Sequence, residues 1–151
     1  MKLWPFFVTA TILCWGAYVP TIHAGQQGFG KNSALRAFLF VGAAYFLMAV
    51  AALGWVTATK AEPLEFTPKG MSLSTLAGIL GALGALGIVF AHLYGGRPIF
   101  VAPLVFAGAP IVNTLVSMIL HRPAKLPSPM FFLGIILAAV GASLVLRFKP
   151  T

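Results

Sequence analysis

The chain has 151 residues, of which 60% are hydrophobic and 8% are charged, and its formal net charge is +8 at pH 7. Soluble domains carry about 25% charged residues, so this composition argues against a soluble fold and favours a membrane protein. Lysine and arginine are scattered in ones and twos between apolar blocks, and because they form no basic face, a nucleic-acid partner is not expected.

Five apolar segments are separated by short connectors that hold most of the charge. About 20 apolar residues cross a hydrocarbon core of about 30 Å, and backbone polar groups in lipid must be paired within a segment, so each segment is predicted to be a transmembrane helix. The sequence therefore predicts an all-α polytopic membrane protein with one transmembrane domain over residues 1–151. The predicted helices cover about residues 3–22, 37–59, 71–91, 98–120 and 130–146.

The segment at about 3–22 has two interpretations. Lys2, the apolar run and a stretch ending at Ala24 loosely resemble a secretory signal peptide with its cleavage site. Ile22, however, is larger than the small residue preferred three positions before cleavage, and Trp15 is unusual in the apolar part of a signal peptide. We therefore favour a retained span, whereas cleavage would leave four helices.

Polar side chains gather on one side of this first segment. Thr11, Cys14, Tyr18 and Thr21 fall within about 80° of arc on a helical projection. This side is either ordinary helix chemistry, with threonines bonded to their own backbone, or one wall of a cavity that faces the fourth segment. Tyr45, in the middle of the second segment, is a weaker cavity candidate.

Small residues recur on one side of the third and fifth segments. Helices in lipid associate through close backbone contact, so such a pattern predicts tight helix packing, and it also permits one helix to slide on another. The glycines that carry this prediction are Gly78, Gly81, Gly134 and Gly141.

The fourth segment, at 98–120, is the most informative stretch. A helix that faces only lipid has no reason to gather polar groups on one side. Here five residues lie within an arc of about 100° on a helical projection, namely Pro110, Asn113, Thr114, Ser117 and His121. Pro103 and Pro110 each remove a backbone donor and predict kinks. A buried amide needs partners, so Asn113 either bridges helices or meets a ligand or water, and both interpretations stay open.

Several missing features narrow the function. Both acidic residues, Glu62 and Glu65, lie in a connector, so no predicted span holds the carboxylate that usually couples transport to protons or cations. His23, His92 and His121 lie in three different regions, so no metal site is predicted, and the latter two are expected to be solvated or interfacial at helix ends. We see no catalytic set and expect neither an enzyme nor a cofactor.

The positive charges do not orient the chain. With five spans, half of the ten Lys and Arg residues lie on each side, so the positive-inside rule gives no bias. Either another signal sets the orientation, or the chain inserts both ways and pairs antiparallel, which would build an inverted repeat from two copies.

Short motifs recur along the chain, among them the run CWGAYVP at residues 14–20 and Arg36 ahead of the second segment. The run resembles the Trp-Gly-x-x-x-Pro signature of the drug/metabolite transporter superfamily, EamA-like branch, and Arg36 resembles that family's arginine ahead of the second helix. Pro110 in the fourth segment and Gly134 with Gly141 in the fifth also fit the pattern. Common members have ten helices in two inverted repeats, so the resemblance implies a half-size member with one five-helix repeat.

The sequence departs from the family at one place. Members often have a glutamate just after the fourth helix, where this chain has His121 and Arg122. The four-helix multidrug branch relies on a first-helix carboxylate that is missing here. Facilitated diffusion or exchange is therefore expected rather than proton antiport.

Together these patterns predict a multi-pass transporter of the cell (inner) membrane that carries small polar or amphipathic metabolites by alternating access. Its expected partners are the lipid bilayer, a small-molecule substrate, and either a second copy or a second half-transporter. Arg36 is a candidate anion contact. The alternative is a non-transporting membrane subunit or assembly protein. The residues expected to line the cavity are Trp15, Tyr18, Tyr45, Asn113 and Ser117.

Overall fold

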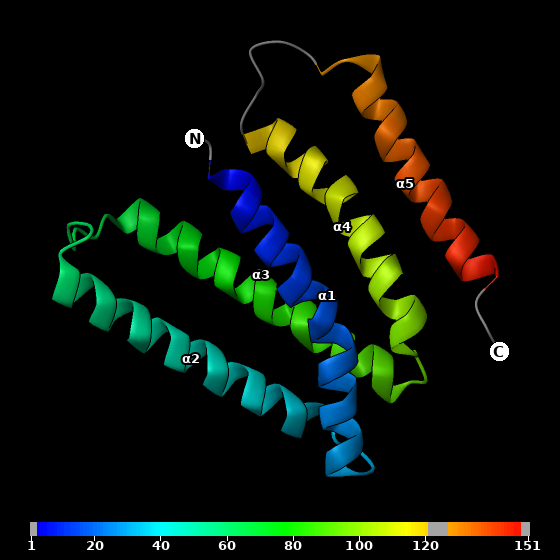
Figure 1. Cartoon of the computed structure of the whole chain (residues 1–151), viewed down its shortest axis with the longest axis horizontal. Helices are drawn as coiled ribbons and strands as arrows, with labels where there is room; N and C mark the ends of the chain where they lie inside the picture. The colour runs from blue at the N-terminus through cyan, green and yellow to red at the C-terminus, as the bar shows by residue number, and fades with distance from the viewer. Residues whose placement is uncertain (1–2, 121–126, 149–151) are drawn as a thin grey trace. The chain divides into compact units, whose positions relative to one another are not determined.

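The computed structural model describes residues 3–120 and 127–148, and the regular elements of this part of the chain are α-helices. All five are long and apolar enough to cross a membrane, which confirms the predicted all-α, multi-pass membrane fold. In chain order they are α1 (Trp4–Phe29), α2 (Ala34–Thr59), α3 (Pro68–Leu93), α4 (Pro98–Leu120) and α5 (Pro129–Arg147) (Figure 1).

The first helix is longer than predicted, because it ends at Phe29 rather than Ile22. Its last turns are polar, which ends the hydropathy signal, but polar residues continue a helix at little cost in free energy. The helix stops at Gly30, which adopts a left-handed φ of 79° and donates its N–H to the Gln27 carbonyl oxygen at 3.0 Å. It also runs unbroken through the candidate cleavage site at Ala24.

Three other helices begin earlier than predicted. The second, α2, begins at Ala34 without a side-chain cap bond from Ser33, whereas α3 and α5 each have an N-terminal cap. The Thr67 hydroxyl accepts the Gly70 N–H at 3.2 Å at the start of α3, and the Ser128 hydroxyl accepts the Phe131 N–H at 3.4 Å at the start of α5. A proline follows each cap, at a position where its missing N–H costs nothing. The bounds of α4 coincide with the predicted segment.

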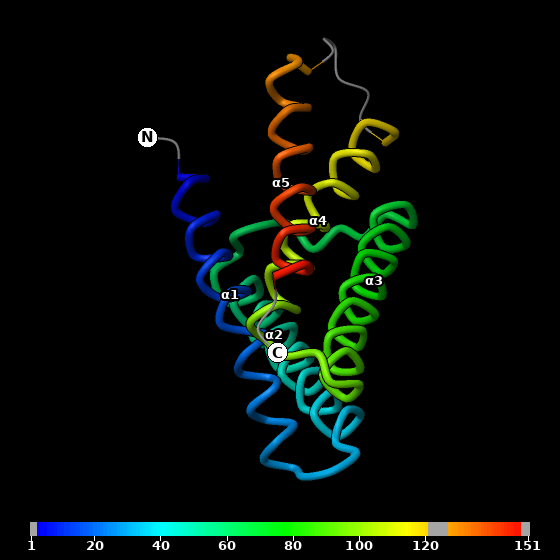
Figure 2. Tube along the Cα trace, turned by 90° about the vertical axis from the view of Figure 1, so that its right-hand side faces the viewer, coloured from blue at the N-terminus to red at the C-terminus, as the bar shows by residue number. Residues whose placement is uncertain are grey.

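The chain divides into two compact units. Unit 1 comprises residues 1–19 and 96–151, and within it α4 packs against α5. Unit 2 comprises residues 20–95, and within it α2 packs against α3 (Figure 2). The first helix contributes to both, and the division falls at Pro20, a proline inside that helix.

Most side chains lie on the surface. Buried apolar residues of unit 2 include Ala85 and Val89, whereas α5 has no buried residue. A soluble protein with so much apolar surface would aggregate, but lipid tails are as apolar as a protein core and solvate such helices.

The predicted packing glycines face open space in the described chain. A Cβ atom added to Gly78, Gly81, Gly134 or Gly141 would meet no atom within 4 Å beyond its own stretch of helix. The tight packing expected at these positions would therefore need another molecule, and it stays a prediction.

Candidate functional site

Unit 1 contains a pocket of about 810 Å³ between the first part of α1 and α4. The Trp15 and Phe106 rings meet edge to face across it, with centroids 6.3 Å apart, an arrangement that aromatic quadrupoles favour. The wall is mainly apolar, with Thr11 and Asn113 as its polar side chains. The lining residues are Thr11, Ile12, Trp15, Gly16, Val105, Phe106, Ala109 and Asn113.

Helical spacing places these side chains together. Thr11 and Trp15 are one helical turn apart on α1, and Ala109 and Asn113 are one turn apart on α4. Residues four apart share a helix face, so each helix presents a continuous strip to the same space. The pocket is thus a direct product of the two helix repeats.

Prolines lie one turn beyond two of the lining residues. Pro20 lacks the N–H that would bond the Gly16 carbonyl, and Pro110 lacks the one that would bond the Phe106 carbonyl. Both helices continue through these prolines, and α4 also continues through Pro103. The Gly16 and Phe106 carbonyl oxygens therefore lose their usual helix donors. This loss adds polar backbone groups to an apolar wall.

Asn113 contributes to this wall an amide that lacks an internal partner. Within residues 3–120 and 127–148 its amide makes no hydrogen bond, and its side chain is exposed. It lies about 6 Å along the helix axis from the middle of α4, at a rise of 1.5 Å per residue. Thr11 differs, because its hydroxyl donates to the Phe7 carbonyl oxygen at 2.9 Å and keeps only acceptor capacity for a ligand.

The structure brings two of the predicted cavity residues together. Trp15 and Asn113 line the same pocket. Tyr18 contacts the Trp15 ring, with centroids 5.7 Å apart, but lies outside the lining set. Ser117 is exposed one turn beyond Asn113, and Tyr45 is exposed on α2 in the other unit.

Sequence reasoning missed the apolar half of the pocket. The apolar side chains that line it include Ile12, Val105, Phe106 and Ala109. In the sequence, nothing distinguishes these residues from lipid-facing residues of the same types. A polar residue one turn away, such as Asn113, is the only local signal that could have found them.

Arg36, the candidate anion contact, binds to the connector between α1 and α2 and to the end of α1. Its guanidinium donates to the Lys31 carbonyl oxygen at 2.9 Å and lies over the Phe29 ring at 5.7 Å from its centroid. Phe29 in turn stacks on Phe40, with centroids 5.5 Å apart. These contacts give Arg36 a structural role, and its role as an anion contact stays a prediction.

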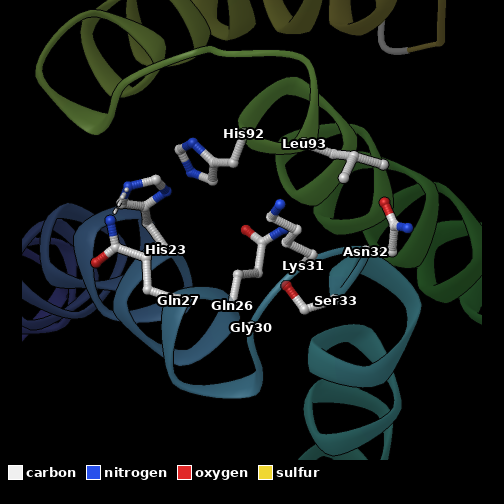
Figure 3. Close-up of a pocket in the computed structure, with 9 residues that line it drawn as sticks. All are labelled: His23, Gln26, Gln27, Gly30, Lys31, Asn32, Ser33, His92 and Leu93. Carbon is white, nitrogen blue, oxygen red and sulfur yellow. Dashed lines mark hydrogen bonds between the residues drawn. The ribbon is translucent and has the colours of Figure 1, made fainter.

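Two histidines that lie far apart in the sequence come together in unit 2. His92, in the last turn of α3, is only 8% exposed, and its ring centroid is 4.6 Å from that of His23 on α1 (Figure 3). The expectation that His92 is solvated is therefore wrong. The reason is the extra length of α1, which brings its polar last turns against the end of α3. The position of His92 at the membrane interface stays a prediction. His121 lies outside the described residues.

Comparison with known proteins found no matching family model, no matching curated protein and no matching solved structure. The resemblance to the EamA-like branch accordingly stays a prediction.

Proposed function

We propose that this membrane protein is a transporter for small polar or amphipathic metabolites. The observation that supports this most is the Asn113 amide, which lies in the wall of the unit 1 pocket without a partner in the described chain. In protein mutational data an unpaired amide in an apolar environment costs about 1–3 kcal/mol. In a helix that faced only lipid, an apolar side chain at this position would be more stable than the amide. A ligand or water in the pocket would form the hydrogen bonds that the amide lacks.

The lining favours recognition by hydrogen bonds and shape rather than by charge. Asn113 offers two donors and one acceptor, and Thr11 offers an acceptor. Trp15 and Phe106 supply apolar and aromatic surface. No lysine, arginine, aspartate or glutamate is among the lining residues, so a charged group would lose its water without gaining a counter-charge. We therefore propose that the part of the substrate bound here is neutral.

The volume is suitable for such a substrate. Ligand pockets usually enclose about 300–1,000 Å³, and this pocket has about 810 Å³. Because the acidic residues of the chain lie in a connector, we propose facilitated diffusion or exchange rather than coupling through an intramembrane carboxylate.

We further propose that the transporter works in the cell (inner) membrane as a dimer, by alternating access of an EamA-like kind. The open glycine faces of α3 and α5 and the absence of buried residues on α5 leave surface for a second copy or a second half-transporter. An antiparallel pair would generate the inverted repeat that alternating access uses.

The same exposed faces favour one alternative, a non-transporting membrane subunit or assembly protein. Such a protein would use its open helix faces for contact with a different membrane protein, and its unit 1 pocket would hold lipid. Crosslinking in native membranes separates the two, because the alternative predicts a heterologous partner and no crosslinked dimer.

The direct test is uptake into proteoliposomes that contain the purified full chain, with a panel of radiolabelled neutral amino acids, sugars and nucleosides. We expect saturable uptake of at least one solute above that of protein-free liposomes. Asn113→Leu should abolish it, whereas Ser117→Ala, on the same helix but outside the pocket, should retain it. Absence of uptake across the panel together with an exclusively heterologous crosslink would overturn the proposal.

A further inference from the structure

Unit 2 holds a second pocket, of about 320 Å³, which the transport proposal does not use. It lies between the last turns of α1, the following connector and the end of α3 (Figure 3). Seven of its nine lining residues have polar side chains, and none of the nine has a carboxylate. The residues that line it are His23, Gln26, Gln27, Gly30, Lys31, Asn32, Ser33, His92 and Leu93.

Gln26 places a buried oxygen in this pocket. Its side chain is 6% exposed, and its amide nitrogen donates to the Val89 carbonyl oxygen at 2.9 Å. This bond fixes which end of the amide is the oxygen, and the oxygen has no hydrogen-bond partner among the described residues. In Figure 3 the oxygen is turned toward the two imidazole rings. A buried, unpaired oxygen needs an explanation, and a bound ion is one.

His23 offers a nitrogen to the same space. Its Nε2 atom lies 3.2 Å from the Gln27 amide nitrogen, and its Nδ1 atom is buried without a hydrogen-bond partner in the described chain. Gln27 is exposed, so its amide can turn by about 180° and present its oxygen to an Nε2–H group. That tautomer leaves the Nδ1 lone pair available, and an oxygen on the other ring nitrogen is the usual second contact of a metal-bound histidine.

His92 completes the arrangement. Its ring lies beside that of His23, with centroids 4.6 Å apart and planes at 56°. Metal–imidazole bonds are about 2.0–2.1 Å long, which puts the centroids of two rings on one tetrahedral ion about 5 Å apart. The observed separation of 4.6 Å is close to this value, so it is compatible with two rings that share one ion.

We propose that His23, Gln26 and His92 bind a divalent first-row transition-metal ion such as Zn²⁺ or Cu²⁺. The ligands are His23 Nδ1, the Gln26 amide oxygen and a ring nitrogen of His92, and the fourth position is open to water or to a small molecule in the pocket. Imidazole ligands suit zinc, copper and nickel, whereas magnesium and calcium prefer several carboxylate or carbonyl oxygens. No residue of unit 1 takes part, so the inference does not depend on the transport proposal.

Lys31 distinguishes this occupant from an anion. Its side chain lines the pocket and is exposed. Its positive charge repels a metal ion but attracts a phosphate group. Lys31→Gln therefore strengthens metal binding and weakens anion binding, and because the side chain is on the surface the substitution leaves folding intact.

The test uses the full chain, purified without a polyhistidine tag and in a Cys14→Ser background, because the exposed Cys14 thiol is itself a metal ligand. Calorimetry with Cu²⁺ and with Zn²⁺ should show one site per chain, and the Cu²⁺ electron paramagnetic resonance spectrum should show two coupled nitrogens. His23→Gln and His92→Gln should each abolish this site. His121→Gln is the matched control and should leave it unchanged.

The exposed Gln27 and Lys31 keep the test decisive if the buried variants fold poorly. Gln27→Ala should weaken metal binding about 10–100-fold, the usual effect of losing the outer contact of a ligating histidine. Lys31→Gln should strengthen it several-fold. Unchanged affinity in both variants would overturn the proposal. So would inorganic phosphate binding that Lys31→Gln weakens, because the pocket would then be an anion site.

Discussion

Replacing Asn113 with leucine should stabilise the protein while removing its transport activity. If the amide serves to bind a ligand, it lowers the stability of the protein when that ligand is absent. Leucine has the same branched arrangement of side-chain heavy atoms, needs no hydrogen bond and is a better helix former than asparagine. Stability and activity are therefore expected to change in opposite directions at this position.

The magnitude follows from the unpaired state of the amide. The Asn113 amide has no hydrogen bond within the described chain, and mutational data put the cost of such a group at about 1–3 kcal/mol. Each kcal/mol shifts the melting temperature of a chain of this size by about 2–4 °C. Asn113→Leu should therefore raise the melting temperature by about 2–12 °C.

Size-exclusion chromatography of a fluorescent fusion, heated in detergent, measures this shift without knowledge of the substrate. Asn113→Gln keeps the amide and should stay near the parent melting temperature, and Ser117→Ala controls for loss of a polar group on the same helix. A lower melting temperature for Asn113→Leu, or a change in its oligomeric state, would show that the amide bridges protein chains. The reasoning about a ligand-facing amide would then be refuted.

Three further expectations can be tested in parallel. Arg36→Ala should lower the free energy of unfolding by about 1–2 kcal/mol, since the bond to Lys31 and the contact with Phe29 are lost; Arg36→Lys should recover less than half of this in thermal melts. Gly70→Ala should gain about 0.5–1 kcal/mol of helix stability in a Thr67→Ala background. It should not gain this in the parent chain, because the new Cβ would lie 2.9 Å from the Thr67 hydroxyl oxygen. A double-mutant cycle measures this coupling. Reporters fused to the C-terminus, one active in the periplasm and one in the cytoplasm, should both be active if the chain inserts in two orientations, and a single active reporter would exclude that.

The sequence by itself determined the class of protein and the number of spans. Hydropathy and length are local properties, and in lipid every backbone group must pair within its own segment. An apolar run of span length therefore specifies a helix without reference to its neighbours. For that reason α4 begins and ends where the sequence predicts. The end of α1 was predicted wrongly because Gly30, rather than the loss of hydrophobicity, terminates it.

Only the tertiary structure decided which side chains share a pocket. Soluble helices reveal their buried face through hydrophobicity, but lipid and protein interior are equally apolar, so this signal is weak in a membrane. The contact of Trp15 with Phe106, and that of His23 with His92, join helices far apart along the chain. Such contacts depend on how two helices pack against each other, and a local sequence pattern does not predict that packing.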